Sequence, residues 1–278
     1  MQKAIPKPIH RSRLRLACGR QYYTLMRYAL WAFGGLRFSK RGEPEPVYTY
    51  AAHKTPLLRK LKDVDMRLQY NKIDNLRIAV PRVDGMTLLP GETFSYWRAV
   101  GRPSRRKGYK PGMILQNGLV TEGIGGGLCQ LSNLIYWLTL HTPLTVTERH
   151  RHNYDVFPDS DRTQPFGTGA TCFYNYGDLM IRNDTDNVFR LRVQVGEREL
   201  EGAWETDAPP EYRYAVYEKE HRIQSEYWGG YSRHNCIYRK KYDRDGTLLE
   251  DAYVVENHAI MTYAPLLYAD HTGGENRC

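Results

Sequence analysis

Apolar residues recur every three or four positions near the start of the chain. Between residues 11 and 38 a 3.6-residue period places them on one face, which predicts a single helix that ends at Gly34 and Gly35. The stripe fits either a helix lying on a membrane surface or a helix docked on the domain. Its members are Leu14, Ala17, Cys18, Tyr22, Leu25, Met26, Ala29 and Phe33.

A second and clearer helix is predicted over residues 128–140. Its apolar positions have the spacing of one buried face, and Pro143 follows its end. A short polar helix is expected over residues 57–70. These two helices would flank a stretch, residues 94–126, that is expected to be rich in loops.

Alternating apolar and polar residues predict several strands. Residues 75–83 alternate before the turn Asp84-Gly85, and residues 145–157 alternate again. Residues 178–195 are predicted to form a hairpin around an Asx-rich turn at residues 183–186. Residues 236–242 and 247–256 flank a second turn, residues 243–246, and predict another hairpin.

These elements predict an α+β fold in which an antiparallel sheet packs against the central helix that starts at Cys129. A basic N-terminal helix precedes this domain and a β extension follows it. We expect a basic helical segment and linker over residues 1–45, the main domain over residues 46–204 and a C-terminal β-hairpin extension over residues 205–278. The charged, proline-broken run at residues 41–46 marks the first boundary.

Composition and charge narrow the class of protein. The chain has 278 residues, 41% hydrophobic and 26% charged, as in folded soluble proteins. Its net charge of +9 is concentrated in residues 1–45, where ten Lys and Arg face two Glu. Because the remaining body is nearly neutral, we expect an anionic membrane surface or an acidic partner rather than nucleic acid.

The cysteines and the least polar segment of the chain indicate where in the cell the protein is expected. Five widely spaced cysteines without a C-x-x-C pair argue against a disulfide framework or a zinc site, and indicate reduced thiols. The apolar run at residues 28–36 is too short for the roughly 20 residues a bilayer needs, and no signal-peptide cleavage pattern is evident. We expect a cytoplasmic protein or one peripheral at the membrane, with no metal or cofactor.

The strongest candidate for chemistry is a glycine-rich turn that leads into Cys129. Backbone N–H groups in the first turn of a helix have no intrahelical partner, so we expect a lowered thiol pKa and a nucleophilic sulfur. The amides of Gly126, Gly127 and Leu128 would bind a developing oxyanion. The alternative is a small buried apolar cysteine behind an ordinary turn.

Two histidines in the following predicted strand are candidate partners of the sulfur. Alternation would place His150 and His152 on one face, with Arg149 and Arg151 on the other. A rise of about 18 Å along the helix and a similar return along the strand would bring one imidazole level with Cys129. The arginines would pair with a substrate carboxylate. Ordinary structural roles remain the alternative for all four.

Four ordered motifs carry a resemblance to a known family. The chain closely resembles the VanW family over roughly residues 70 to 200. The resemblance implies a bacterial cell-envelope role connected with glycopeptide (vancomycin) resistance, and for some members L,D-transpeptidase activity on peptidoglycan through the residue that is Cys129 here. Its motifs also contain Gln130 and Tyr154, which we assign to substrate binding with Arg149 and Arg151. The motifs are residues 89–95, 108–111, 125–132 and 148–154.

One position departs from the family pattern. Many members carry Asp-Ala-Thr where this chain has Gly169-Ala170-Thr171, and Asp159 or Asp161 would have to replace that carboxylate. Two functions stay open. Either Cys129 is the nucleophile and His152 (or His150) the general base of an acyltransferase acting on peptidoglycan stem peptides or precursors, or the protein is a non-catalytic accessory protein that binds a precursor or a partner enzyme at the membrane.

Overall fold

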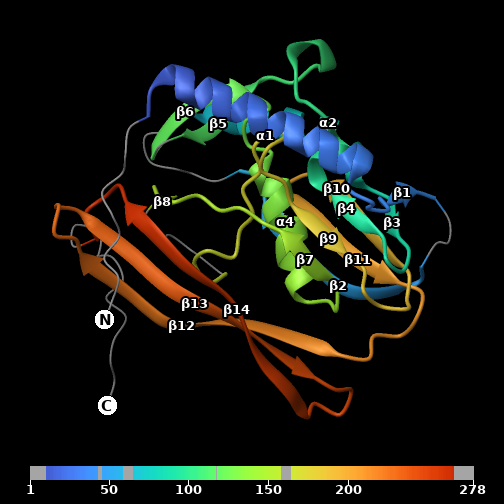
Figure 1. Ribbon diagram of the computed structural model, residues 1–278. Helices are drawn as coiled ribbons and strands as arrows, with labels where there is room; N and C mark the ends of the chain where they lie inside the picture. The colour runs from blue at the N-terminus through green and yellow to red at the C-terminus, as the bar shows by residue number, and fades with distance from the viewer. Residues whose placement is uncertain (1–10, 43–45, 59–64, 117, 158–163, 266–278) are drawn as a thin grey trace, which may run out of the picture.

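The chain folds into a mixed arrangement of helices and antiparallel sheets, which confirms the predicted α+β class (Figure 1). The computed structural model describes residues 11–42, 46–58, 65–116, 118–157 and 164–265. Its helices are α1 (Arg13–Phe33), α2 (Met66–Val83), α3 (Tyr96–Val100) and α4 (Cys129–Leu140), with one 3-10 turn, η1 (Arg105–Lys107).

The largest sheet has the strand order β1-β3-β10-β11-β2, with every neighbouring pair antiparallel. A smaller antiparallel sheet has the order β4-β9-β7, and β5 and β6 form a separate hairpin. The strands of these sheets are β1 (Lys40–Arg41), β2 (Tyr48–Pro56), β3 (Met86–Leu88), β4 (Thr93–Ser95), β5 (Pro111–Gln116), β6 (Leu119–Ile124), β7 (Thr145–Glu148), β9 (Met180–Arg182), β10 (Phe189–Val195) and β11 (Glu199–Thr206).

The fourth sheet is built mainly from strands in the C-terminal part of the chain. The strands β12 (Arg213–Ser225), β13 (Tyr231–Tyr242) and β14 (Leu248–Met261) pair in antiparallel order, and β8 (Tyr154–Asp155) runs parallel to β14 at the edge. The predicted hairpin at residues 236–256 is therefore confirmed. In Figure 1 this sheet lies along the lower side, α1 crosses the top, and α4 stands between them.

The core is built around α4, which packs against β2 and β11 of the largest sheet. The predicted apolar face is confirmed, because Leu131, Leu134, Ile135 and Leu138 are all buried. The indole Nε1 of the buried Trp204 in β11 donates a hydrogen bond to Thr139 Oγ1 at 3.0 Å. Helix and sheet are thus joined by both apolar and polar contacts.

The predicted strand at residues 75–83 is wrong, because this segment is the second half of α2. The alternation of Leu76, Ile78 and Val80 over a few residues resembled a strand, but the buried positions follow a helical period over the whole element. They are Leu68, Gln69, Lys72, Asn75, Leu76, Ala79, Val80 and Val83. Of the short helix expected at residues 57–70, residues 59–64 lie outside the described residues. Residues 57 and 58 are not helical, and α2 begins at Met66.

Residues 178–195 contain two strands, as predicted, but they do not pair as a hairpin. β9 pairs with β4 and β7, whereas β10 pairs with β3 and β11. The buried Asn183 turns the chain from one sheet to the other, and its Nδ2 donates to the carbonyls of Leu88 and Asn187. The loop-rich expectation for residues 94–126 is wrong in part, since α3, η1, β5 and β6 lie there.

The strand expected over residues 145–157 is divided. β7 ends at Glu148 and β8 resumes only at Tyr154, so Arg149 to Asn153 lie outside any strand. This segment runs beside residues 169–173, with the N–H of Thr171 donating to the carbonyl of His150 at 2.9 Å. The two histidines and two arginines therefore do not lie in a strand. The expected alternation of their side chains between two faces of a sheet is not supported.

Candidate functional site

The start of α4 is held in place by two buried side chains from other elements. Asn75 of α2 donates from Nδ2 to the carbonyls of Lys110 and Gly126, both at 3.0 Å, and its Oδ1 accepts from Lys110 N–H at 2.8 Å. The hydroxyl of Tyr96 donates to the carbonyl of Leu128 at 3.0 Å. The glycine-rich turn therefore has a fixed position relative to α2 and α3.

The glycines of this turn are required by close backbone contact. A Cβ added to Gly126 would lie 2.1 Å from the carbonyl carbon of Gly112 in β5, a distance that real atoms do not tolerate. Gly127 has φ +89°, and the stem of Lys72 occupies the space that a side chain would need there. The turn thus packs tightly against β5 and α2.

Two of the three amides expected to bind an oxyanion remain uncommitted. The N–H of Gly126 donates to the carbonyl of Gly123 at 2.9 Å, so it is used by the turn itself. Within the described residues, the N–H groups of Gly127 and Leu128 have no recorded acceptor. These two amides directly precede Cys129.

Burial raises the pKa of the Cys129 thiol, contrary to the lowered pKa expected from its place at the start of a helix. The backbone N–H groups of Cys172 and of Cys129 itself face the sulfur and oppose this shift, but they do not outweigh the desolvation. Cys129 as a whole is partly exposed. The resting site therefore holds a neutral thiol at neutral pH.

The segment that carries Cys172 is hydrogen-bonded to two residues of α4, Ser132 and Asn133, which lie about one helical turn after Cys129. Ser132 Oγ donates to the carbonyl of Ala170 at 2.6 Å, and Asn133 Oδ1 accepts from Ala170 N–H at 2.7 Å. A Cβ at Gly169 would lie 2.7 Å from Asn133 Oδ1, so Asn133 fills the space that a side chain at position 169 would need. Asp159 and Asp161, the predicted substitutes for the missing carboxylate, lie outside the described residues.

His150 has a carboxylate partner that sequence analysis missed. Glu148 Oε1 lies 2.9 Å from His150 Nε2, accepts from the N–H of Asp178 at 2.9 Å, and forms an ion pair with Arg27 of α1. Burial alone would raise the pKa of Glu148, but the hydrogen bonds and the ion pair with these partners have the larger effect and lower it to about 2. Glu148 is therefore an ionised acceptor for the imidazole.

His152 lies in a more apolar setting. Its ring meets the Phe173 ring edge-on, with 6.3 Å between centroids, and burial lowers its pKa, so the imidazole is neutral at neutral pH. In the part of the chain that the structure describes, no recorded hydrogen bond or ring contact joins Cys129 to His150 or His152. The sulfur and an imidazole are thus not paired in this state.

The two arginines that alternate with the histidines in the sequence bind backbone carbonyls. Arg149 donates to the carbonyls of Gly167 and Gly169 and lies over the Tyr136 ring. Arg151 donates to the carbonyl of His258 in β14 at 2.6 Å. Burial lowers the Arg151 pKa to about 10, which leaves it charged. Both side chains connect this segment to its neighbours.

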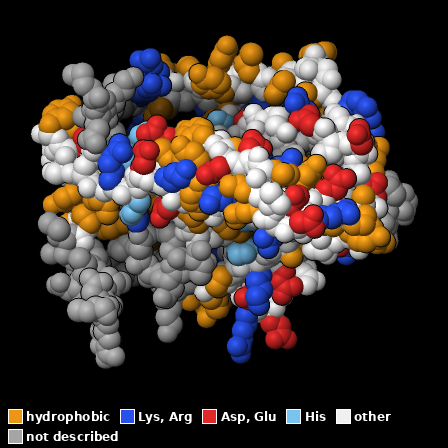
Figure 2. All heavy atoms as spheres, turned by 90° about the horizontal axis from the view of Figure 1, so that it is seen from below, with side chains coloured by type: hydrophobic (Ala, Val, Ile, Leu, Met, Phe, Trp, Pro, Cys, Tyr) orange, Lys and Arg blue, Asp and Glu red, His pale blue; other side chains and the backbone are white. Residues whose placement is uncertain are grey.

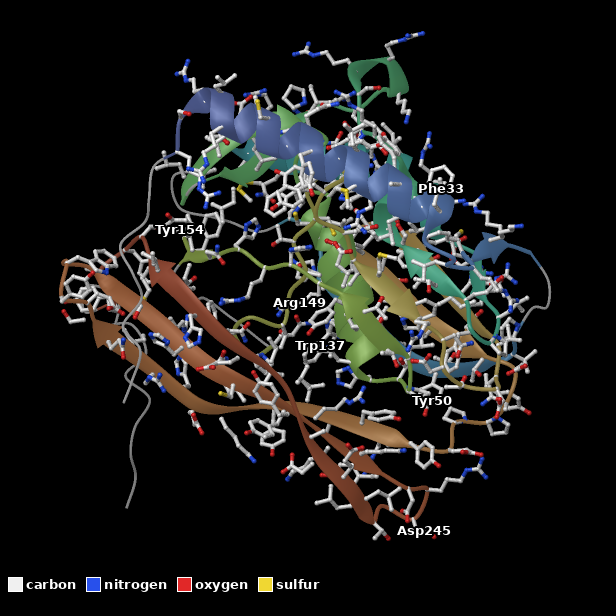
Figure 3. All side chains as sticks on the ribbon, viewed as in Figure 1. Phe33, Tyr50, Trp137, Arg149, Tyr154 and Asp245 are labelled. Atoms are coloured by element: carbon white, nitrogen blue, oxygen red, sulfur yellow. The ribbon has the colours of Figure 1, made fainter. Side chains whose placement is uncertain are left out.

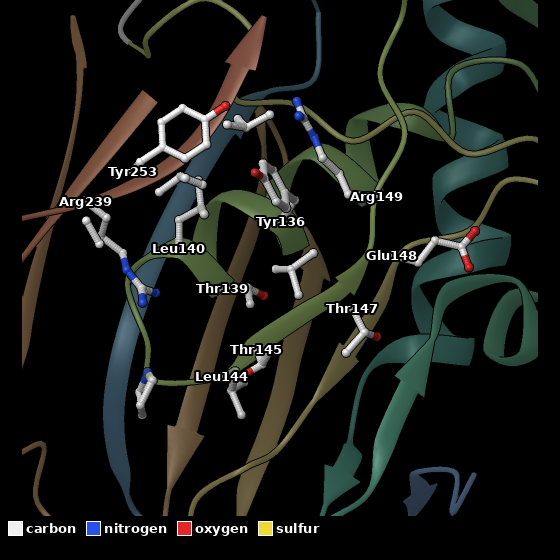
Figure 4. A pocket seen from close by; sticks show the side chains of 15 residues that line it. Tyr136, Thr139, Leu140, Leu144, Thr145, Thr147, Glu148, Arg149, Arg239 and Tyr253 are labelled. Carbon is white, nitrogen blue, oxygen red and sulfur yellow. The ribbon is translucent and has the colours of Figure 1, made fainter. Parts of the chain in front are cut away.

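A groove of about 360 Å³ lies between the C-terminal half of α4, β7 and the C-terminal sheet (Figure 4). Arg149 and Tyr136 stand together in it, while Arg239 of β13 and Tyr253 of β14 contribute from the other wall. Tyr136 follows Cys129 by seven residues, which is two helical turns, so the groove starts about 10 Å along the same face of α4. Figure 3 shows Arg149 near the middle of the molecule.

The remaining predicted binding residues have structural contacts. Gln130 donates from Nε2 to Thr55 Oγ1 at 3.0 Å and to the carbonyl of Pro56 at 2.9 Å, which ties α4 to the end of β2. The Tyr154 ring packs against Gly118. Among the described residues, no group of three or more His, Cys, Asp or Glu is arranged to hold a metal ion. No described helix is both long and apolar enough to cross a bilayer.

Comparison with known proteins places the chain in a family. Residues 71–204 match the family profile described as VanW like protein. Over 190 residues the chain is 35% identical to the vancomycin B-type resistance protein VanW of Enterococcus faecalis, covering 68% of this chain and 69% of that protein. The chain belongs to the VanW family.

A second relative of this VanW-family chain is YoaR of Bacillus subtilis, an uncharacterized protein. The identity is 29% over 120 residues, covering 43% of this chain and 38% of YoaR, so the chain spans well under half of that relative. No solved structure matches the chain.

Three residues of the site were not predicted from the sequence. Asn75 could have been found as a polar residue on the apolar face of a helix, once α2 is assigned correctly. Cys172 and Glu148 could not, because their roles depend on contacts with Cys129, His150 and Arg27 that only the fold creates.

Proposed function

We propose that this chain acts at the bacterial cell envelope by cysteine-dependent acyl transfer on peptidoglycan stem peptides or their precursors, and that it serves glycopeptide resistance. The name of its Enterococcus relative indicates vancomycin resistance for that protein. The observation that carries the proposal is the pair of uncommitted amides, Gly127 and Leu128, immediately before the partly exposed Cys129. Amides in this position can bind the oxygen of a tetrahedral intermediate formed at the sulfur.

The chemistry is a thiol-dependent exchange of one amide for another. Cys129 Sγ attacks a stem-peptide carbonyl carbon, its proton passes to an imidazole, and the carbonyl oxygen becomes an oxyanion facing the two amides. The carbon–nitrogen bond then breaks, and the imidazole returns the proton to the leaving amine. An acceptor amine attacks the resulting thioester and releases the thiol, so atoms and protons balance without a cofactor.

The raised pKa of Cys129 decides how the thiol must be activated. A thiol that is neutral at rest cannot react as a preformed thiolate, so its proton has to leave during the attack. Two neighbours in the chain are suited to accept it: His152, which burial keeps neutral, and His150, which Glu148 orients. Substrate binding would have to bring one of these imidazoles to the sulfur.

The groove beside Tyr136 supports the choice of a peptide substrate with a free carboxylate. It begins about two helical turns from Cys129 and contains the guanidinium groups of Arg149 and Arg239. Each guanidinium has five N–H donors, more than the backbone carbonyls use. A stem peptide lying along α4 would place its carboxylate there and its reacting carbonyl near the sulfur.

The proposal is tested in bacteria that lack their own copy of this gene. Wild type, Cys129→Ser and Cys236→Ser are compared for muropeptide composition and glycopeptide susceptibility. Cys236 is a matched control, because it is also a partly exposed free cysteine but lies in β13. We expect Cys129→Ser alone to lose the wild-type profile. Identical profiles for all three strains would contradict acyl transfer.

A second candidate is a non-catalytic accessory role in binding a cell-wall precursor or a partner enzyme. The observation that favours it is the neutral Cys129 thiol without a recorded imidazole partner. Under this alternative, purified protein binds a stem peptide equally well as wild type and as Cys129→Ser, and mass spectrometry finds no acyl adduct. If the mass of the peptide that contains Cys129 increased by the mass of the acyl fragment, this candidate would be excluded.

A further inference from the structure

Helix α1 turns its apolar face away from the rest of the protein. The eight stripe residues that define the helix in the sequence are all exposed, with Leu14 at 74% and Phe33 at 87% of their full accessible surface. Figure 3 shows Phe33 at the end of this helix nearest the β1 strand. A helix packed on a domain normally directs such a stripe inward.

The opposite face of α1 meets the domain through polar contacts and through Trp31, which packs against the hydrophobic core. Arg27 is the buried residue of the helix, flanked by the partly buried Thr24 and Trp31. Its guanidinium donates to the carbonyl of Asn175 at 3.0 Å and pairs with Glu148. The Tyr28 hydroxyl lies 2.9 Å from the Tyr174 hydroxyl. These contacts fix which side of α1 faces outward.

The charge of this region has one sign. Residues 11–42 contain eight Lys or Arg and no Asp or Glu. The lower side of the molecule in Figure 1 has a different charge pattern. Acidic and basic side chains are interspersed there (Figure 2). An exposed apolar stripe within a wholly basic segment is complementary to a surface that has anionic groups on the outside and an apolar layer beneath them.

We propose that α1 is a membrane-surface helix that inserts its exposed stripe into the interface of an anionic phospholipid bilayer. Leu, Met and Phe would enter the boundary between headgroups and acyl chains, tyrosine rings would sit at headgroup level, and the surrounding arginines would meet lipid phosphates. An acidic protein partner would match the charge but leaves the breadth of the apolar stripe unexplained. A second copy of this basic helix would bring like charges together.

This docking mode would place the candidate site close to the bilayer. Arg27 joins α1 to Glu148, which in turn contacts His150. The inference does not rest on the proposed acyl transfer, since it concerns only the outward face of α1. A membrane-bound binding protein without catalysis would use the helix in the same way.

The test is flotation of the purified full chain with lipid vesicles. Vesicles of phosphatidylcholine alone are compared with vesicles containing about a third phosphatidylglycerol, at low and high salt. The test variant is Leu25→Gln combined with Phe33→Gln, two exposed positions that keep the net charge. The matched control is Leu249→Gln, an exposed leucine in β14. Circular dichroism verifies that each variant is folded.

We expect at least tenfold tighter binding to the anionic vesicles than to the neutral ones, weaker binding at high salt, and at least a tenfold loss in the double variant but not in Leu249→Gln. Equal flotation of the double variant would overturn the proposal. So would the absence of any binding to anionic vesicles, or sedimentation showing that the stripe instead joins two copies of the chain and that the double variant separates them.

Discussion

Arg27 in the N-terminal helix forms an ion pair with Glu148 at the end of β7, 121 residues later in the chain. The same Glu148 oxygen contacts Nε2 of His150. A single carboxylate therefore links the helix with the exposed apolar stripe to one of the two candidate imidazoles. This relationship makes the position of α1 and the orientation of His150 depend on each other.

Replacing Arg27 is expected to loosen α1. Arg27→Met removes a buried cation and leaves the carboxylate of Glu148 with one partner fewer, which should lower the free energy of unfolding by about 3 kcal/mol. Arg20→Met, at an exposed position of the same helix, should cost less than about 0.5 kcal/mol. Urea denaturation measures both values.

The partnership itself is tested by a double-mutant cycle. Because Arg27→Met and Glu148→Gln remove the same ion pair, their combination should cost clearly less than the sum of the single changes. Strict additivity would show that the two side chains stabilise the fold independently.

Glu148 should also make stability depend on pH. Its pKa is lowered from 4.5 to about 2 in the folded protein, so the folded state favours the ionised form. The resulting stabilisation, about 3 kcal/mol, is fully present above pH 4.5 and is lost as the pH falls through about 2. The measurement is urea denaturation of wild type and Glu148→Gln at pH 6 and pH 3.

In that experiment the stability difference between the two proteins should shrink at the lower pH. Carboxylates that do not interact with Glu148 titrate in both proteins and cancel in the difference; Asp178, whose pKa the charge of Glu148 helps to raise, does not cancel fully. A difference that stays constant between pH 6 and pH 3 would mean that Glu148 titrates normally in the folded state.

Elements that depend on neighbouring residues could be predicted from the sequence. The buried face of α4 and the hairpin of β13 and β14 are encoded within a few residues of each other, by periodicity and by the turn at Asp243. The end of α1 at Gly34 is equally local, since its N–H bonds back to the carbonyl of Leu30.

Features that depend on distant contacts could not be predicted. The alternation around Ile78 indicated a strand because the helical period of α2 becomes clear only when Leu68 and Lys72 are included. The strands on either side of Asn183 belong to different sheets because each finds partners far away in the chain. The raised pKa of Cys129 follows from the burial of its thiol in the folded protein, which no helix-dipole argument includes.

Cys129 should react slowly with an alkylating reagent at neutral pH. Because burial raises its pKa, the thiolate fraction is small, and iodoacetamide should modify it at least tenfold more slowly than a free cysteine derivative at pH 7.5. The alkylation rate should continue to increase at pH values above about 8.5, the pKa of an ordinary cysteine thiol. Peptide mapping separates Cys129 from the exposed Cys18. A rate that reaches its plateau below pH 8 would indicate a thiolate in the resting protein, contrary to the packing seen here.

Gly126 tests whether the turn before Cys129 is as closely packed as the contacts indicate. In Gly126→Ala the new methyl group would lie 2.1 Å from the carbonyl carbon of Gly112, so β5 and the start of α4 must move apart. We expect a loss of stability of about 3 kcal/mol or more, together with faster alkylation of Cys129 as the sulfur gains solvent. The control is Gly19→Ala, a half-buried glycine within α1 whose added methyl meets nothing within 4 Å. Since alanine favours a helix over glycine, this variant should gain up to about 1 kcal/mol and leave the alkylation of Cys129 unchanged. Equal stability of Gly126→Ala and wild type in urea denaturation would show that the two backbone segments are not in the tight contact on which the geometry of the site depends.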